Sequence, residues 1–230
     1  MKRSFAAIQA QVIECTRCPE LRRYCRRVAA EKKRAYLEST YWARPVPAFG
    51  DPKARLLLVG LAPGAHGSNR TGRPFTGDAS GGFLYPALYR AGFASQAGSV
   101  SLEDGMQLRD CVITAALRCA PPQNKPSFAQ LARCAPYLSA EIEALPNLQA
   151  IVGLGSIGTR AAIAALIERG YRLTPKRPQF CHGAHFEAER NGRRIGVLAS
   201  FHPSRQNTNT GKLTREMFDA IFARAAQLLR

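Results

Sequence analysis

The sequence of 230 residues predicts an α/β fold, a three-layer α/β/α sandwich around a mostly parallel central sheet of about four strands. Four short runs are almost continuously apolar, which is typical of strands that are buried on both faces of a parallel sheet. Helical patterns separate these runs, so strand and helix alternate along the chain. The length suits one domain with a proper core, and we expect that domain to span residues 1–230.

The expected elements follow in chain order. Strands are predicted at 54–60, 110–117, 150–155 and 194–201. Helices are predicted at 82–91, 128–145, 157–169 and 213–229. The pair Asn191-Gly192 predicts a small hairpin with an extra antiparallel strand near 180–190. Residues 1–50 contain two expected basic helices, followed by the proline-rich run ARPVPAFGDP, and we expect this N-terminal extension to wrap the core.

The composition narrows the class of partner. Lys and Arg number 33 against 16 Asp and Glu, so the formal net charge is +17, which favours nucleic acid or an anionic membrane surface. The longest apolar stretch is too short to cross a bilayer, and no export signal is expected at the N-terminus. The odd count of seven cysteines argues against a disulfide framework. We therefore expect a cytoplasmic protein and, since nothing indicates oligomerisation, a monomer.

The loop after the first predicted strand, GLAPGAHGSNRTGRPFTGD at 60–78, is rich in glycine. Glycines at this density allow backbone N–H groups to approach a flat or anionic ligand closely. Phe75 suits stacking on a planar ring, and Asp78 is the only carboxylate of the loop. The alternative is an exposed polar loop that Phe75 merely anchors.

The loop after the last predicted strand, HPSRQNTNTG at 202–211, is the second candidate. His202 stands at a strand end, where an imidazole can stabilise negative charge on a leaving group. Ser204 and Arg205 begin a run of donors suited to phosphate oxygens. The alternative for His202 is a hydrogen bond to a backbone carbonyl without any role in function.

Four of the cysteines form a possible ligand set, and they are Cys15, Cys18, Cys119 and Cys134. Zinc ribbons favour two close pairs, whereas the second pair here is widely split. Iron–sulfur clusters accept looser spacing, so the spacing slightly favours a cluster over zinc. The remaining thiols, Cys25, Cys111 and Cys181, are interpreted as ordinary buried cysteines.

Three weaker motifs are interpreted as structural or general. Gly153, Gly155 and Gly158 match GxGxxG, but the region about twenty residues on is basic, so we interpret them as a tight strand-to-helix turn rather than a dinucleotide site. CHGAH at 181–185 is a possible metal site, although a solvated strand edge is favoured. The basic run at 22–34 suits either a phosphate backbone or a solvated helix face.

The two loop motifs and the four cysteines closely resemble the family 5 uracil-DNA glycosylases, an iron–sulfur branch of the uracil-DNA glycosylase superfamily. The resemblance extends from Cys15 to about Thr214. It implies a three-layer α/β/α domain that excises uracil, and some other deaminated or damaged bases, from DNA. It also implies a [4Fe–4S] cluster held by the four cysteines.

The resemblance further implies a role for individual residues. Asp78 would be the principal catalytic carboxylate, with Asn124 of the turn PPQNKP and His202 as further polar groups of the pocket. Phe75 would stack on the extruded base. The backbone around Gly64 and His66 would contact that base.

Two departures from related enzymes concern water activation and base selection. Leu61-Ala62 stands where sister families place a polar group, and Ala115-Ala116 stands where they place a base-reading Asn. The first departure predicts that the catalytic burden falls on Asp78, and the second predicts a substrate range broader than uracil. Two other classes stay open, a nucleotide-binding oxidoreductase and a non-enzymatic iron–sulfur sensor that binds DNA.

Overall fold

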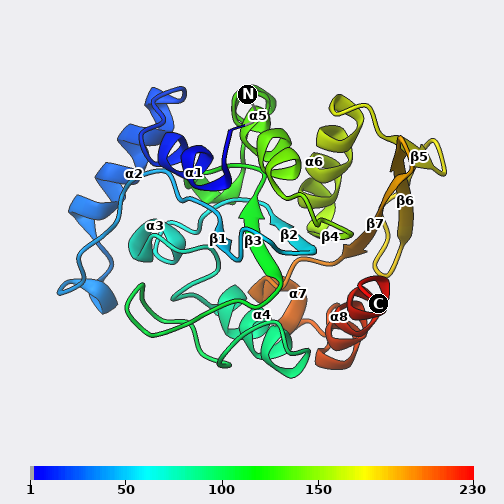
Figure 1. The fold of residues 1–230 in the computed structure, drawn as a ribbon. Helices are drawn as coiled ribbons and strands as arrows, with labels where there is room; N and C mark the ends of the chain where they lie inside the picture. Colours follow the sequence, from blue (N-terminus) through cyan, green and yellow to red (C-terminus); the bar gives the residue numbers. More distant parts are fainter. Residues whose placement is uncertain (1–2) are drawn as a thin grey trace.

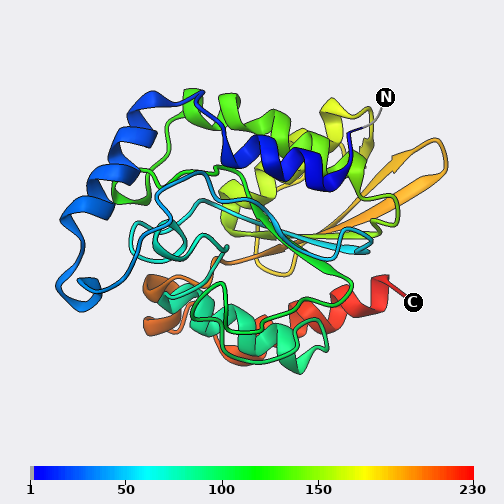
Figure 2. The ribbon, with the colours of Figure 1, turned by 60° about the vertical axis from the view of Figure 1, so that its left-hand side comes forward.

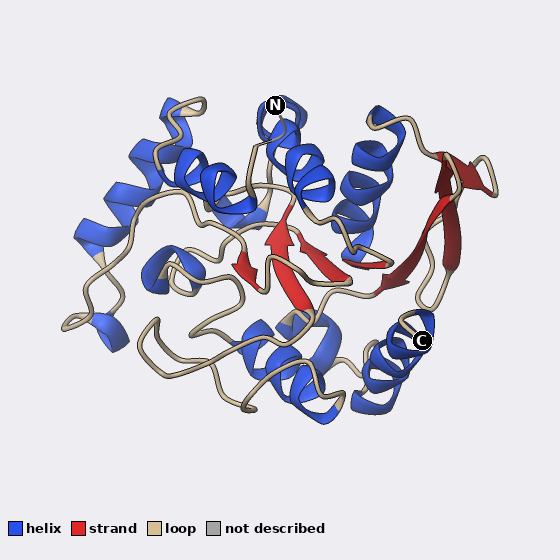
Figure 3. Cartoon of the chain, viewed as in Figure 1, coloured by secondary structure: helices blue, strands red, loops and turns tan. Residues whose placement is uncertain are grey.

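The computed structural model describes residues 3–230, which form a mixed sheet of seven strands between layers of helices (Figures 1 and 3). The strands are β1 (Phe49–Gly50), β2 (Leu56–Gly60), β3 (Cys111–Ala115), β4 (Ala150–Leu154), β5 (Arg172–Thr174), β6 (His185–Arg190) and β7 (Arg193–Ser200). The α-helices are α1 (Phe5–Ile13), α2 (Pro19–Glu31), α3 (Ser68–Thr71), α4 (Ala79–Arg90), α5 (Phe128–Ala144), α6 (Gly155–Glu168), α7 (Arg205–Asn209) and α8 (Arg215–Leu228). Two 3₁₀ turns, η1 (Arg34–Tyr36) and η2 (Pro122–Asn124), complete the described elements.

The sheet has the order β1-β3-β2-β4-β7-β6-β5. Its centre, β3-β2-β4-β7, is parallel throughout, so the predicted parallel core is confirmed. The prediction of about four strands for the whole sheet is wrong, because β1, β6 and β5 extend it in antiparallel pairs. The hairpin at Asn191 and Gly192 is confirmed, with φ of 51° and 79°, and it joins β6 to β7. The strands β1 and β5, with 2 and 3 residues, are too short to leave a pattern in the sequence.

The predicted helices are confirmed with boundaries shifted by a few residues. The exception is the expectation of two basic helices at the N-terminus. Only α2 is basic, because α1 has the sequence FAAIQAQVI and carries no charge. The uncharged α1 can therefore pack against the core, and its Ile8 and Val12 are buried.

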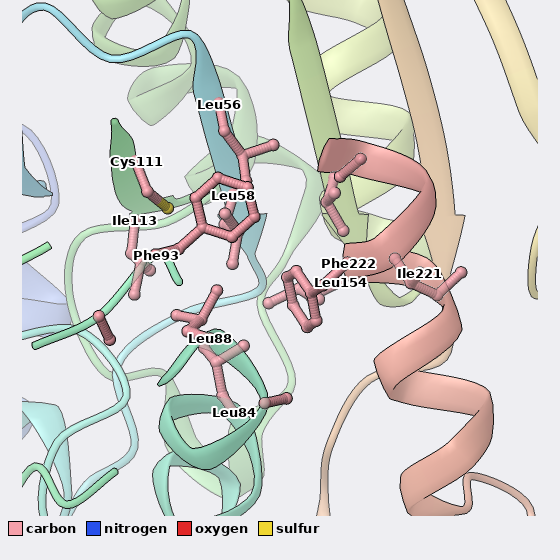
Figure 4. Close-up of a cluster of buried hydrophobic side chains, with 14 of the residues drawn as sticks. Leu56, Leu58, Leu84, Leu88, Phe93, Cys111, Ile113, Leu154, Ile221 and Phe222 are labelled. Atoms are coloured by element: carbon pink, nitrogen blue, oxygen red, sulfur yellow. The ribbon is translucent and has the colours of Figure 1, made fainter. Parts of the chain in front are cut away.

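The two faces of the sheet bury separate apolar cores, as the alternation of side chains along each strand requires. Leu56 and Leu58 of β2 face the core under α4 and α8, and Figure 4 shows them in one apolar cluster with Leu88 and Phe222. Leu57 of β2 faces the opposite core, under α5 and α6. Helices thus cover both faces of the sheet (Figure 2).

The N-terminal segment packs on the α5 side through a third apolar cluster. A buried polar network joins it to the core at Glu141 of α5. The carboxylate of Glu141 accepts hydrogen bonds from Gln9 Nε2 at 3.0 Å and Thr114 Oγ1 at 2.8 Å, and it forms an ion pair with Arg118 at 2.5 Å. Glu141 and Arg118 are almost fully buried, so the pairing satisfies two charges that would otherwise be costly in the interior. Among the described residues, no helix is long and apolar enough to cross a membrane.

Candidate active site

A cleft of about 960 Å³ opens where the parallel strands end. Its walls come from the loops that follow β2, β3, β4 and β7, which is where ligands bind in open α/β sheets. The eight residues predicted to be catalytic or to bind the substrate all line this cleft, and they are Gly64, His66, Phe75, Asp78, Asn124, His202, Ser204 and Arg205. The two loop motifs, more than a hundred residues apart in the chain, therefore meet at one cavity.

Asp78 is the N-cap residue of α4. Its carboxylate accepts a hydrogen bond from the Gly81 N–H at 3.0 Å, which satisfies one of the free donors at the start of the helix. Burial raises the pKa of Asp78, and the backbone donors and the charges of Arg70 and Arg205 offset part of that rise. The carboxylate is thus fixed in place and only partly exposed to the cleft.

The glycines of the GAHG turn make room for this carboxylate. A Cβ on Gly67 would lie 2.1 Å from Asp78 Oδ2, and a Cβ on Gly64 would lie 3.1 Å from the same atom. Any side chain at Gly67 would displace the carboxylate. The glycines of this loop therefore leave room for the Asp78 carboxylate as well as for a ligand.

Phe75 and His202 lie together on the floor of the cleft. Their ring centroids are 5.7 Å apart with an interplanar angle of 30°. Phe75 is only 9% exposed, and a Cβ on Gly60 would lie 2.8 Å from its ring. Burial lowers the pKa of His202 to about 4, so its imidazole is neutral at physiological pH.

His66 is held by a residue that the sequence did not single out. Tyr41 Oη and His66 Nδ1 are 2.9 Å apart, and the two rings meet edge-on. Burial and the nearby charges of Lys33 and Arg70 lower the pKa of His66. A neutral His66 with Nδ1 engaged by Tyr41 leaves Nε2 as the ring nitrogen open to another partner.

The other three residues differ in their exposure and contacts. Asn124 is exposed at the rim, on a turn with φ of 56° at that residue. Ser204 caps α7, and its Oγ accepts a hydrogen bond from the Asn207 N–H at 3.4 Å. Arg205 is exposed beside the cleft. In the free protein, the hydroxyl of Ser204 therefore caps α7, and this role does not require a phosphate ligand.

Residues 47–226 match the family described as the Uracil DNA glycosylase superfamily. The chain belongs to that superfamily. It is 50% identical over 214 residues to a Type-5 uracil-DNA glycosylase of Thermus thermophilus, with 93% of each chain covered. It is 43% identical over 226 residues to a Type-5 uracil-DNA glycosylase of Mycobacterium tuberculosis, covering 98% of this chain and 82% of the other. A Type-4 uracil-DNA glycosylase of Archaeoglobus fulgidus is 32% identical over 161 residues, covering 69% of this chain and 70% of the other. The family resemblance inferred from the motifs is confirmed.

The four predicted cysteine ligands of this superfamily member border one small cavity, beside the cleft. Four arginines, Arg17, Arg22, Arg118 and Arg133, line the same cavity. Burial raises the pKa of Cys134 to about 11 and also raises that of Cys18. Within residues 3–230, no three His, Cys, Asp or Glu side chains are grouped as ligands of a metal ion.

The weaker motifs of this superfamily member have structural roles. A Cβ on Gly158 would lie 2.2 Å from the Val59 carbonyl oxygen, so the glycine permits close packing of α6 on β2, as a tight turn requires. In CHGAH, Cys181 is exposed, so the interpretation of this residue as a buried cysteine is wrong. His182 accepts a hydrogen bond from the Phe201 N–H at 3.1 Å.

Sequence reasoning missed one wall of the cleft. Tyr24 belongs to α2, Lys33 precedes η1, and Tyr36 ends η1. Tyr24 and Lys33 fall in the basic run at 22–34, which the sequence did not connect with the cleft. The Arg70 guanidinium lies 4.1 Å from the centroid of the Tyr36 ring and donates to the His66 carbonyl at 2.9 Å, so it links this wall to the glycine-rich loop. A basic segment that contains tyrosines was the available signal, but nothing in the pattern indicated where it would pack.

Proposed function

We propose that this protein hydrolyses the N-glycosidic bond of uracil, and of other deaminated bases, in DNA and leaves an abasic site. The observation that carries the proposal is the convergence of a carboxylate and a neutral imidazole, from two distant loops, on one cleft with an aromatic floor. The names of the Type-5 relatives support the same activity. The net charge of +17 supplies attraction to a polyanionic substrate.

Base flipping is the first step, because the target bond is out of reach inside a duplex. In the cleft, the flipped base lies against Phe75, whose ring is fixed by Gly60 and His202. The backbone of the turn around Gly64 and His66 contacts the edge of the base. A mispaired base costs less to unstack, which favours lesions over normal pairs.

Cleavage of the bond develops positive charge on the sugar and negative charge on the departing base. The Asp78 carboxylate stabilises the sugar cation and orients the attacking water. The neutral His202 ring donates a hydrogen bond to the base as its charge develops. Asn124 at the rim and Arg205 beside the cleft contact the DNA around the lesion.

The apolar residues near the strand ends set the substrate range. Ala115 lines the cleft where related enzymes are expected to place a base-reading Asn, and the apolar Leu61 and Ala62 line it as well. A pocket that makes few hydrogen bonds to its ligand discriminates weakly between ligands of similar shape. We therefore extend the proposed range beyond uracil to other deaminated bases.

A [4Fe–4S] cluster fits the cysteine cavity by the chemistry of its donors. Four cysteines border this cavity: Cys15 and Cys18 from the loop between α1 and α2, Cys119 from the β3–α5 connection, and Cys134 from α5. Thiolates are the ligands of such clusters, and the four arginines offset their negative charge. When bound, the cluster supplies a covalent link between the N-terminal segment and the core. The proposed steps at the base use only the residues of the cleft.

The test is excision by Asp78→Asn under single-turnover conditions, on oligonucleotides that each carry one lesion. We expect the variant to bind DNA as the parent does but to release base at least ~100-fold more slowly. Asp51→Asn, a carboxylate at the opposite end of β2, is the matched control and should keep the parent rate. Unchanged excision by Asp78→Asn would remove Asp78 from the reaction. A parent protein that forms no abasic site from any lesion would refute the proposed function.

A further inference from the structure

Cys25 is a fifth cysteine close to the four predicted ligands of the cluster. It lies in α2 and is fully buried, with an exposed fraction of 0%. A buried cysteine usually behaves as a small apolar residue, so burial alone assigns no role. The sulfur atom that Cys25 contacts distinguishes it from the other buried thiols.

The helix α2 directs Cys25 toward the cysteine cavity. Cys25 follows Cys18, the N-cap residue, by seven positions, which is about two turns, so both lie on one face of the helix. Leu21 is buried on the same face. This face belongs to the apolar cluster that also contains Cys119 and Ala120 of the β3–α5 connection. The fold thus brings Cys25 to a predicted ligand from another part of the chain.

The Cys25 thiol makes two contacts with this connection. Its Sγ lies 3.7 Å from the carbonyl oxygen of Ala120, and its side chain is hydrogen-bonded to that of Cys119. The described residues that border the cysteine cavity include Cys119 but not Cys25. Cys25 therefore contacts a predicted ligand from outside the cavity, without being one of the four ligands.

The backbone at Cys25 is also fixed from its other side. The Cys25 carbonyl oxygen accepts a hydrogen bond from Asn69 Nδ2 at 3.3 Å. The same nitrogen donates to the Ala65 carbonyl oxygen at 3.3 Å, and Asn69 is only 1% exposed. This buried amide ties α2 to the glycine-rich loop. A side chain that orients or tunes a metal ligand needs such a fixed position.

The chemistry of ligation decides the direction of the hydrogen bond between the two sulfurs. A cysteine that binds a metal has lost its S–H proton, so its sulfur can only accept. Cys25 keeps its proton, because it is not a ligand, and is the donor of the pair. A negatively charged acceptor forms a stronger hydrogen bond than a neutral carbonyl. The Cys25 S–H therefore favours the ligand sulfur of Cys119 over the carbonyl of Ala120.

We propose that Cys25 tunes the [4Fe–4S] cluster by donating a hydrogen bond to the sulfur of Cys119. This inference rests on the cluster of the proposed function and adds a positioning residue outside the four ligands. Hydrogen bonds to the sulfurs are one of the factors that set the reduction potential of such clusters. A donor stabilises the more negative, reduced state, so Cys25 raises the potential of the cluster.

The test compares the reduction potentials of the parent, Cys25→Ala and Cys25→Ser by voltammetry after anaerobic purification. At a fixed potential we expect Cys25→Ala to favour the oxidised cluster about threefold more than the parent does, a shift of ~30 mV for one electron. Cys25→Ser should restore most of the potential, because its hydroxyl can donate. Cys111→Ala, which removes an equally buried thiol from another apolar cluster, is the matched control and should keep the parent potential.

Infrared spectroscopy tests the hydrogen bond itself. Subtraction of the Cys25→Ser spectrum from that of the parent isolates the S–H stretching band of Cys25. A stronger acceptor lowers the frequency of this band. We therefore expect a lower frequency in the protein that holds the cluster than in the iron-depleted protein, where the Cys119 sulfur is a neutral thiol.

Several results would overturn the proposal. These are equal potentials in Cys25→Ala and the parent, a Cys25 band that ignores the cluster, and a parent protein without iron. A loss of iron in Cys25→Ala as complete as in a ligand variant such as Cys134→Ser would make Cys25 a ligand and overturn it too. Base excision is measured separately. A parent that holds the cluster but releases no base would refute the proposed function, and the potentials would still decide the role of Cys25.

Discussion

Replacement of His202 by Asn should remove a specific part of the pH dependence of stability. Burial lowers the pKa of His202 in the folded protein from 6.5 to about 4. Between these values the unfolded chain binds a proton that the folded chain does not, so the free energy of unfolding falls as the pH decreases through this window. The linkage relation gives a loss of about 0.2 kcal/mol at pH 7 and about 2 kcal/mol at pH 5. The parent protein should thus lose about 2 kcal/mol through His202 alone between pH 7 and pH 5.

Urea unfolding at the two pH values measures this difference directly. We expect the decrease between pH 7 and pH 5 to be smaller in His202→Asn than in the parent by about 2 kcal/mol. Gln206→Ala, an exposed and uncharged position in the same loop, should show the decrease of the parent. An equal decrease in His202→Asn and the parent would refute the claim that His202 is neutral because it is buried. The same argument predicts that protonation of His202 places no acid limb near pH 6.5 in the excision rate.

Three further predictions concern the support of the site. Gly67→Ala should slow excision at least ~10-fold with DNA binding retained, because the new Cβ would lie 2.1 Å from Asp78 Oδ2; unchanged excision would contradict this. Tyr41→Phe should shift the tautomer populations of His66, as measured by ring ¹⁵N chemical shifts, because it removes the hydroxyl that holds Nδ1 at 2.9 Å; an identical spectrum would argue against that contact. Cys134→Ser should lower the iron and sulfide content of the purified protein and its thermal stability, and full retention of both would contradict the cluster.

Matched controls for two of these changes come from the same chain. A Cβ on Gly82 meets nothing within 4 Å, so Gly82→Ala in α4 should keep the parent rate of excision. Cys181 is exposed and lies outside the cysteine cavity, so Cys181→Ser should keep the iron content of the parent.

The parallel core and the two loops of the site could be predicted because their signals are local. A strand buried on both faces, such as Leu56–Gly60, is apolar at nearly every position. The loops that follow β2 and β7 carry their motifs as continuous stretches, and parallel strands bring their carboxyl ends to one edge. The sheet therefore placed Asp78 and His202 in one cleft, as the sequence analysis expected.

The wall formed by Tyr24, Lys33 and Tyr36 could not be predicted, because only tertiary packing brings it to the cleft. The same is true of the hydrogen bond between Tyr41 and His66, which joins residues 25 positions apart on two irregular segments. The burial of Phe75 depends on the absence of a side chain at Gly60 beneath it. Such contacts leave no periodic pattern in the sequence.

The location of the cysteine cavity has a mechanical consequence for the cleft. Cys15 and Cys18 belong to the N-terminal segment, which also supplies Tyr24, Lys33 and Tyr36 to the cleft. Cys119 and Cys134 belong to the central body of the protein. The proposed cluster, held by these four sulfurs, would anchor the wall formed by Tyr24, Lys33 and Tyr36 at its base, and Arg118 borders both the cysteine cavity and the cleft. Oxidative loss of the proposed cluster would therefore loosen this side of the entrance for DNA while every group at the reacting bond stayed chemically intact.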